Sequence, residues 1–151
     1  MARMSAGLLI HRTRAGALEV LLVHPGGPFW AKKDDGAWSI PKGEYAEGED
    51  PLAVAKRELE EETGLSVDGA FVKLEPIRQR SGKVVTAFAI EADVDASRIT
   101  SNTFEMEWPP RSGRKQHFPE VDRAAWFAIG DARVKLLASQ VPLLDQLTRA
   151  R

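Results

Sequence analysis

The chain has 151 residues, of which 43% are hydrophobic and 28% charged, and its formal net charge at pH 7 is -1. This length and composition predict one domain over residues 1–151, with a sizeable core. The small net charge offers no attraction to duplex nucleic acid or an anionic membrane. Zero cysteines exclude disulfides and thiolate sites. With no apolar run long enough to span a membrane, we expect a cytoplasmic protein.

The N-terminal third predicts a hairpin followed by a long loop. Alternating apolar residues predict strands over 6–11 and 18–24, joined by a polar turn around 13–16. A loop rich in glycine and aromatic residues follows over 24–36. A short strand is then expected over 38–40.

The clearest helix signal spans 51–63. Asp50 is a good N-cap, Pro51 suits the first helical position, and Gly64 suits the position after the last turn. Its apolar side, formed by Leu52, Ala55 and Leu59, is expected to dock on a sheet.

Beyond this helix, strands are predicted over 71–79 and 83–91, paired across the Ser81-Gly82 turn. Both faces of the second strand are apolar, which indicates a sheet covered on both sides.

The C-terminal third predicts a hairpin over 103–108 and 116–118, a short strand over 124–127, and helices over 131–137 and 142–150. Mixed strands with helices before and after them predict an α/β fold, an α/β/α sandwich with a mixed β-sheet between helices.

Three carboxylates share one face of the predicted helix. Glu58, Glu61 and Glu62 stand at positions i, i+3 and i+4, and each like-charge pair at this spacing costs a few tenths of a kcal/mol. A bound cation would offset that cost, and ligands that are all oxygen suit Mg²⁺, with Mn²⁺ as a substitute. The alternative is a solvated acidic face.

The loop before the helix extends this pattern. Over 23 residues the sequence resembles the signature G-x5-E-x7-R-E-U-x-E-E-x-G-U of the Nudix hydrolases, where U is aliphatic, at Gly43, Glu49, Arg57, Glu58, Leu59, Glu61, Glu62, Gly64 and Leu65. The resemblance implies a single Nudix hydrolase domain whose strand-loop-helix unit binds Mg²⁺ and a diphosphate. It also implies hydrolysis of a nucleoside diphosphate linked to another moiety.

Each charged position in this motif has a physical role. Phosphoanhydride hydrolysis needs charge neutralisation and an activated water, which metal held by Glu58, Glu61 and Glu62 would supply. We expect Arg57 to orient Glu58 or to span the carboxylates by bidentate contact. At Gly43 a backbone carbonyl can approach the metal, since glycine permits a close approach.

The remaining two motif residues are assigned structural roles. Glu49 precedes the N-cap, and we interpret it as a brace near the positive end of the helix. Gly64 ends the helix.

A downstream glutamate is the next candidate. In Nudix enzymes of the nucleoside-triphosphate type, a glutamate six residues before a late-strand tryptophan serves as an extra metal ligand or a base. Glu120 precedes Trp126 by this interval. Glu105 and Glu107 are its competitors.

Several residues are candidates for substrate binding. Lys42, in a Pro-Lys-Gly sequence before the motif, resembles Nudix members that act on diadenosine polyphosphates, and its ammonium can serve as a point charge on a distal phosphate. Lys32 and Arg80 are further candidates for phosphate contact. Trp30 either stacks a base or stabilises the core.

The markers of substrate subgroups are absent. Arg80 stands where ADP-ribose enzymes often carry a proline, and Ser81 and Gly82 stand where diadenosine polyphosphate enzymes often carry a tyrosine. The sequence therefore predicts a Mg²⁺-dependent pyrophosphohydrolase acting on a small-molecule nucleotide, with Lys42 favouring dinucleoside polyphosphates. The alternatives are a house-cleaning nucleoside triphosphate pyrophosphatase, a nucleotide-sugar or ADP-ribose hydrolase, and a non-catalytic nucleotide-sensing module. Oligomeric state and the roles of segments 24–36 and 101–117 stay open.

Overall fold

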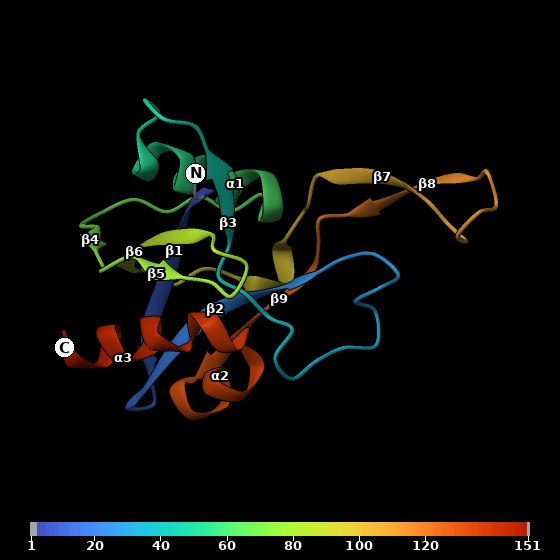
Figure 1. Ribbon diagram of the computed structural model, residues 1–151. Coiled ribbons are helices and arrows are strands. Elements are labelled where there is room, and N and C mark those ends of the chain that lie inside the picture. The colour runs from blue at the N-terminus through green and yellow to red at the C-terminus, as the bar shows by residue number, and fades with distance from the viewer. Residues whose placement is uncertain (1–2, 151) are drawn as a thin grey trace.

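A computed structural model describes residues 3–150 (Figure 1). Its main sheet has seven strands in the order β4-β6-β1-β2-β9, with β3 beside β1 and β5 beside β6. Strands β1 and β6 are parallel, whereas every other pair in this sheet is antiparallel. The strands are β1 (Met4–Arg14), β2 (Ala17–Pro25), β3 (Lys42–Tyr45), β4 (Val72–Lys73), β5 (Ile77–Arg78), β6 (Val84–Glu91) and β9 (Val121–Ala128).

Helices cover both faces of this sheet. Helix α1 (Pro51–Thr63) lies on one face, and α2 (Ile129–Lys135) and α3 (Val141–Arg149) lie on the other (Figure 1). Short 3₁₀ helices, η1 (Ala96–Arg98) and η2 (Ala138–Gln140), occupy two of the connections. The predicted α/β/α sandwich with a mixed sheet is confirmed.

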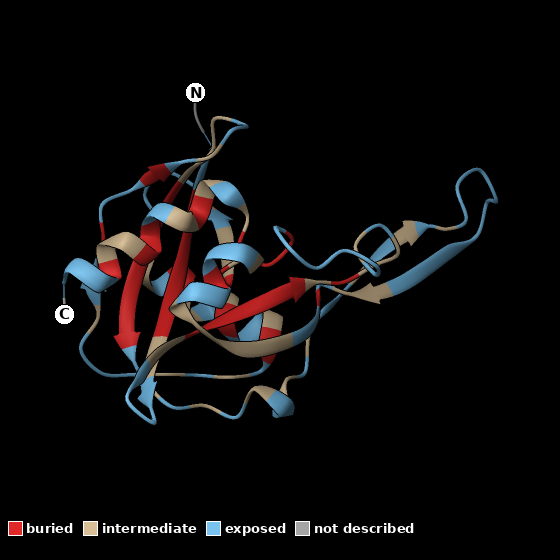
Figure 2. Ribbon diagram, turned by 90° about the horizontal axis from the view of Figure 1, so that it is seen from below, coloured by how far each residue is buried: buried red, intermediate tan, exposed pale blue. Residues whose placement is uncertain are grey.

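Strand alternation divides the core into two layers. In β6, Phe88 and Ile90 face α1, whereas Val85, Ala87 and Ala89 face α2 and α3. Figure 2 shows this buried layer along the central strands and on the inner sides of the helices. Because both faces are covered, the central strands are apolar on both sides, as the sequence predicted.

Helix α1 has the predicted bounds. The Asp50 side chain accepts a hydrogen bond from the Ala53 amide at 3.1 Å, and Gly64 adopts a left-handed conformation with φ of 73°. Its buried residues are Val54, Ala55, Leu59 and Thr63, whereas Leu52, which was predicted on the apolar side, is half-buried.

The bounds of two predicted strands were wrong. The segment 38–40 forms only two isolated bridges, and the strand that follows is β3. This segment crosses close above Gly7 of β1, whose neighbour Leu8 donates its amide to the Pro41 carbonyl at 3.1 Å. The predicted strand over 71–79 is interrupted into β4 and β5, which pair with β6 at separate places.

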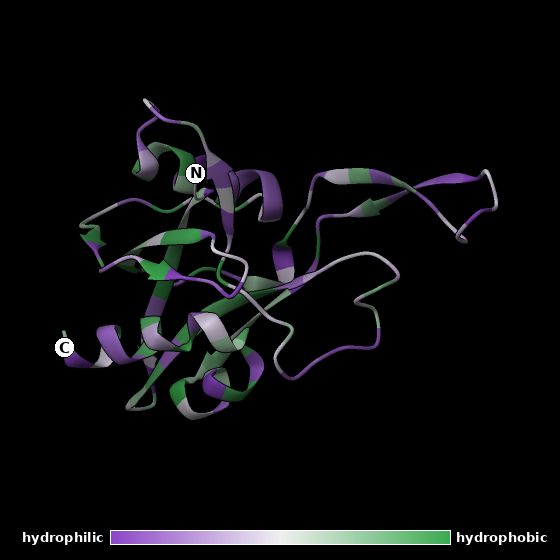
Figure 3. Cartoon of the chain, viewed as in Figure 1, coloured by the Kyte–Doolittle hydropathy of each residue, from purple (hydrophilic) through white to green (hydrophobic). Residues whose placement is uncertain are grey.

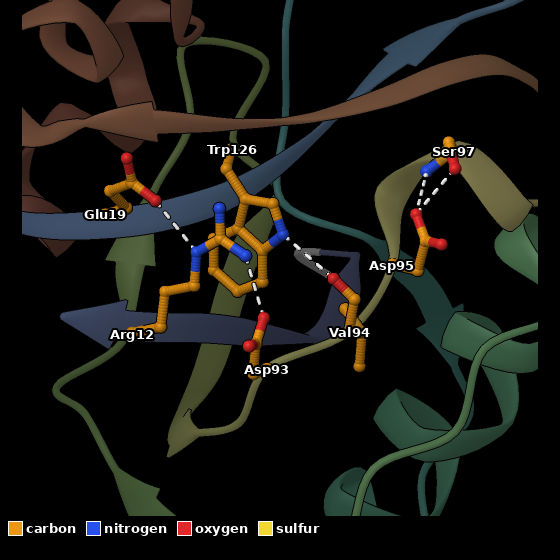
Figure 4. Close-up of polar contacts among 7 residues, drawn as sticks. All are labelled: Arg12, Glu19, Asp93, Val94, Asp95, Ser97 and Trp126. Carbon is orange, nitrogen blue, oxygen red and sulfur yellow. Dashed lines mark hydrogen bonds and ion pairs between the residues drawn. The ribbon is translucent and has the colours of Figure 1, made fainter. Parts of the chain in front are cut away.

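Near the C-terminal end of β1, the side chain of Arg12 stacks on the ring of Trp126. Arg12 lies 4.0 Å from the ring centre of Trp126 and pairs with Glu19 at 2.8 Å and Asp93 at 2.7 Å (Figure 4). The Trp126 indole donates to the Val94 carbonyl at 3.0 Å. These contacts fasten β9 and the chain after β6 to the β1–β2 hairpin.

A second, two-stranded sheet projects from the main sheet. Strands β7 (Thr103–Glu107) and β8 (Lys115–Pro119) form the predicted hairpin, which extends away from the other elements (Figure 1). Figure 3 shows that hydrophobic residues concentrate in the main sheet and that the end of the hairpin is hydrophilic. Among the described residues, no helix is long and apolar enough to cross a membrane.

The crossing above Gly7 yields a stability prediction. A Cβ at Gly7 would lie 2.5 Å from the Pro41 carbonyl oxygen and 2.7 Å from the Lys42 Cβ. We therefore expect Gly7→Ala to lower the free energy of unfolding by about 1 to 3 kcal/mol, as overpacking does. Urea denaturation measures this, with Gly130→Ala as the control because a Cβ at Gly130 meets nothing within 4 Å. Equal stability of the two variants would contradict the prediction.

Candidate active site

The carboxylates of α1 meet the strand β3. A Cβ added at Gly43 would overlap the carboxyl group of Glu58, so only glycine leaves room for that group. The Lys42 amide, one residue earlier, donates a hydrogen bond to Glu62. The motif therefore brings the helix carboxylates against the backbone at the start of β3.

Burial and mutual repulsion raise the pKa values of two of these groups. Burial, followed by the charge of Glu58, raises the pKa of Glu62 from 4.5 to about 8. The pKa of Glu58 is raised by burial and then by the charge of Glu61. Glu120 adds a smaller repulsion to both. Four carboxylates thus act on one another electrostatically, which concentrates negative charge at this place.

Glu120 comes to this cluster from a distant part of the sequence, between β8 and β9. It directly precedes β9, and its backbone is held by Asn102 and Gly26, each at a nitrogen–oxygen distance of 2.9 Å. The competing residues lie on the hairpin instead. Glu105 pairs with Lys115 at 3.7 Å and His117 at 3.4 Å, and Glu107 accepts from the Gly113 amide at 2.7 Å.

Arg57 and Glu49 form a chain of ion pairs at the edge of the cluster. Arg57 lies 3.6 Å from Glu49 and 3.8 Å from Glu61, so it spans the acidic residues rather than contacting Glu58 in a salt bridge. Glu49 also accepts from the Ala46 amide at 2.8 Å. It therefore braces the loop before α1 and makes no bond to the first helical amides.

A cavity of about 240 Å³ opens beside the carboxylates. Trp30, Lys42, Glu62 and Glu120 all contribute to its wall. Burial lowers the pKa of Lys42, and the neighbouring Lys83 lowers it further, while Glu62, Glu44 and Glu58 raise it in part. The cavity thus combines a cation, two carboxylates and an indole ring.

The other substrate candidates lie elsewhere. Neither Lys32 nor Arg80 belongs to the wall of this cavity, and both are exposed, so their contact with phosphate stays a prediction. Lys33 lies 5.0 Å from the ring centre of Trp30. Phe29 is 62% exposed and packs edge-on against Trp108, with ring centres 5.5 Å apart.

The structure adds residues that sequence analysis did not single out for the site. Ser39 and Leu137 line the cavity, and the buried Gln140 accepts from the Ile40 amide at 3.0 Å. Gln140 thereby holds the chain that leads into Lys42. No short-range pattern identifies Gln140, because its partner lies 100 residues away.

The residues fit a divalent cation. Within residues 3–150, no three acidic or histidine side chains are already arranged as a metal site. The donors are nevertheless all oxygen, which suits Mg²⁺ or Mn²⁺. Lys42 lowers the pKa values of Glu58 and Glu62, but burial and the neighbouring carboxylates together keep both raised. Glu58, Glu61, Glu62 and Glu120 are the residues that would hold the ion.

A larger cavity at the opposite end of β1 carries no such chemistry. It measures about 420 Å³ and is lined by Arg12, Asp93, Asp95 and Trp126 among others. Arg12 pairs with Asp93, Asp95 accepts from Ser97, and Trp126 donates to the Val94 carbonyl, as Figure 4 shows. Size alone therefore does not locate the functional site.

The pKa of Glu62 yields a prediction for stability. Between pH 4.5 and about 8 the folded chain keeps a proton on Glu62 that the unfolded chain has lost, so stability falls as pH rises through this window. In the presence of a chelator we expect Glu62→Gln to be more stable than the parent at pH 8, by about 1 kcal/mol or more, with no difference at pH 4.

Denaturation with and without Mg²⁺ measures this effect. The ion should stabilise the parent and have little effect on Glu62→Gln. The matched control is Glu60→Gln, an exposed position on the same helix. A destabilised Glu62→Gln at pH 8 in chelator would refute the prediction.

Comparisons with known proteins identify the family of this chain. A model of the NUDIX domain matches residues 1–147. Nudix hydrolase 7 of Arabidopsis thaliana is 41% identical over 76 residues, which are 46% of this chain and 26% of that protein, so the match spans about a quarter of the relative.

Two solved structures share the fold. A binary complex of the C. elegans Ap4A hydrolase is 23% identical with a TM-score of 0.67, covering 97% of this chain and 96% of that one. The NUDIX domain of Shewanella oneidensis NrtR, complexed with ADP ribose, is 17% identical with a TM-score of 0.68, covering 99% and 88%. Since the family match extends over nearly the whole sequence, the chain belongs to the Nudix family.

Proposed function

We propose that this protein is a hydrolase that depends on a divalent metal and cleaves a phosphoanhydride bond in a compound containing a nucleoside diphosphate. The observation that carries the proposal is the convergence of Glu62, Glu120 and Lys42 on one cavity, with Glu58 packed beside them against Gly43. The same cavity therefore has acidic side chains that could hold a metal ion and a lysine that could bind phosphate.

The side chains divide the work of hydrolysis. Glu58, Glu61 and Glu62 would hold Mg²⁺, which when bound supplies charge neutralisation on the phosphates. Water attacks phosphorus, the bridging P–O bond breaks, and the leaving phosphate takes the bonding electrons. Glu120, which lines the same cavity, would accept the proton of the attacking water or add a ligand to the metal. Arg57 restrains Glu61 from the rim of the cluster.

Lys42 supports dinucleoside polyphosphates as the preferred substrates. Lys42 lines the cavity and interacts electrostatically with Glu62, and its charge would contact a phosphate beyond the one attacked. Trp30, in the same wall, offers a ring face for a base. The C. elegans structure belongs to an Ap4A hydrolase, whereas the NrtR domain was crystallised with ADP ribose, so both substrate classes belong in the comparison.

A substrate screen tests the proposed activity. Purified protein is incubated with Ap4A, nucleoside triphosphates, ADP-ribose and nucleotide sugars, with Mg²⁺ or with chelator, and phosphate-containing products are resolved. We expect turnover only with metal, and a loss of about 10² to 10⁴-fold in Glu58→Gln. Glu60→Gln, on the exposed side of α1, should keep the parent rate. Nucleotide binding without turnover of any substrate would instead indicate a sensing module.

The downstream glutamate gives a second prediction. Glu120 lines the cavity while Glu105 forms ion pairs on the hairpin. We expect Glu120→Gln to lower kcat by about tenfold or more, as loss of a supporting metal-site group does, and Glu105→Gln to leave it unchanged. Steady-state kinetics on one substrate decide between them. A reversed order of the two variants would place the active glutamate on the hairpin.

Lys42 gives a third prediction, on substrate ranking. We expect kcat/KM to rank Ap4A above nucleoside triphosphates, with ADP-ribose and nucleotide sugars last. Lys42→Ala should narrow the gap between the first two by about tenfold, since it removes a charge-assisted contact to a distal phosphate. Lys32→Ala is the matched control, because Lys32 is exposed and outside the cavity wall. If ADP-ribose leads in the parent, the ranking is refuted.

A further inference from the structure

A buried histidine joins three separate segments next to the cavity. His24, in β2, is 0% exposed. Its Nδ1 lies 2.8 Å from Asp122 Oδ1 of β9, and its Nε2 lies 2.6 Å from the carbonyl oxygen of Lys33. A carbonyl only accepts hydrogen bonds, so Nε2 carries a hydrogen, and Nδ1 shares a proton with the Asp122 carboxylate. Both ring nitrogens are therefore engaged.

An irregularity in β9 directs Asp122 towards this ring. His24 is paired with Arg123, but the next residue of β2, Pro25, is paired with Val121. Asp122 is thus the extra residue of a β-bulge, a feature that redirects side chains and occurs often beside active sites. The bulge begins one residue after Glu120.

The backbone of Glu120 is connected to the same segments. Its carbonyl accepts from the Gly26 amide at 2.9 Å. A Cβ at Gly26 would overlap the Pro119 carbonyl, so glycine allows this close crossing. The chain around Glu120 is consequently held at two points, through Gly26, which follows β2, and through the pair formed by His24 of β2 and Asp122.

The third segment is loop 26–36, which carries Trp30. Turn hydrogen bonds run from the Trp30 amide to the Gly27 carbonyl at 3.3 Å and from the Lys33 amide to the Trp30 carbonyl at 2.9 Å. His24 holds the carbonyl of Lys33, the last residue of these turns. Fixing Lys33 therefore fixes the turn that places Trp30 in the cavity wall.

The ion pairs of this loop lie nearer the surface. Lys135 pairs with Asp34 at 2.6 Å and with Asp35 at 3.0 Å, and both carboxylates are more than half exposed. Ion pairs as exposed as these contribute little to stability. The Trp38 indole, which packs edge-on against His24, also donates to Asp34 at 2.8 Å. Two buried side chains, His24 and Trp38, thus attach the loop, and His24 is the one bonded to Lys33.

We propose that His24 and Asp122 are positioning residues of the active site. The pair holds loop 26–36 against the bulged start of β9, so that Trp30 and Glu120 face one cavity. It acts on substrate binding through Trp30, because Glu120 keeps its separate backbone bonds to Gly26 and Asn102, and it touches neither substrate nor metal. Its kinetic consequence rests on the proposed hydrolase function, whereas its effect on the loop does not.

Hydrogen exchange tests the structural part without any assay of activity. His24→Phe keeps a ring against Trp38 but removes both hydrogen bonds, and Asp122→Ala removes one. Asp122→Asn is the conservative variant, because an amide can donate to the unprotonated Nδ1 of a neutral histidine. We expect faster amide exchange over 26–36 in the first two variants and near-parental exchange in the third.

A matched control separates this effect from general destabilisation. Trp126→Phe removes the bond from the indole to the Val94 carbonyl at the opposite end of the sheet. It should leave exchange over 26–36 unchanged. If His24→Phe does not fold, Asp122→Ala carries the test, since Asp122 is partly exposed. Unchanged exchange over 26–36 in Asp122→Ala, or a uniform rise throughout the chain, would overturn the proposal.

Kinetics with Ap4A test the functional part. A contact made equally in the ground state and the transition state affects KM alone. We expect His24→Phe and Asp122→Ala to raise KM by about tenfold with kcat within about threefold, as loss of one well-formed contact does, and Asp122→Asn to restore KM. A fall in kcat without a change in KM would overturn this role. Absence of Ap4A turnover in the parent would refute the proposed substrate and leave the exchange experiment as the test of positioning.

Discussion

The site depends on the contact between Gly43 and Glu58. Helix α1 approaches β3 so closely that the Glu58 carboxyl group occupies the volume of a side chain at position 43. The helix is anchored on the sheet by Val54, Ala55 and Leu59, and its end is fixed by Gly64. Apolar packing on one side of α1 thereby forces its carboxylates into a partly buried position on the other.

This forced proximity has an electrostatic cost that the function requires. Burial and repulsion raise the pKa values of Glu58 and Glu62, so the cluster is unfavourable while its charges are unneutralised. Ligand sites often retain such groups at the expense of stability. A divalent cation and a polyphosphate would together balance the acidic residues and Lys42. The arrangement is therefore consistent with a site that binds a divalent cation together with a polyphosphate.

Short-range signals predicted the part of the site that lies in one segment. Asp50, Pro51 and Gly64 determine the bounds of α1, because capping acts between neighbouring residues. The same spacing rules placed the three glutamates on one face. The strand predicted over 38–40 was wrong, because the backbone partners of this segment, Val23 and Leu136, belong to distant parts of the chain.

Long-range partners account for what the sequence did not reveal. His24 and Asp122 are 98 residues apart, and neither stands in a pattern that indicates a pair. A bulge shifts the register of β9 at this point, and a one-residue irregularity leaves no clear periodic signal. Glu120 was predicted from its spacing in the sequence before Trp126. The residues proposed to orient it could be recognised only in the folded structure.

The most direct measurement of the central claim is the position of a bound metal. A crystal grown or soaked with Mn²⁺, which shares the oxygen-ligand preference of Mg²⁺ and scatters anomalously, locates the ion without an assay. We expect an anomalous peak among Glu58, Glu61 and Glu62, beside Gly43. This peak should be lost in crystals of Glu62→Gln. A peak confined to another carboxylate group, or none at a saturating concentration, would contradict it.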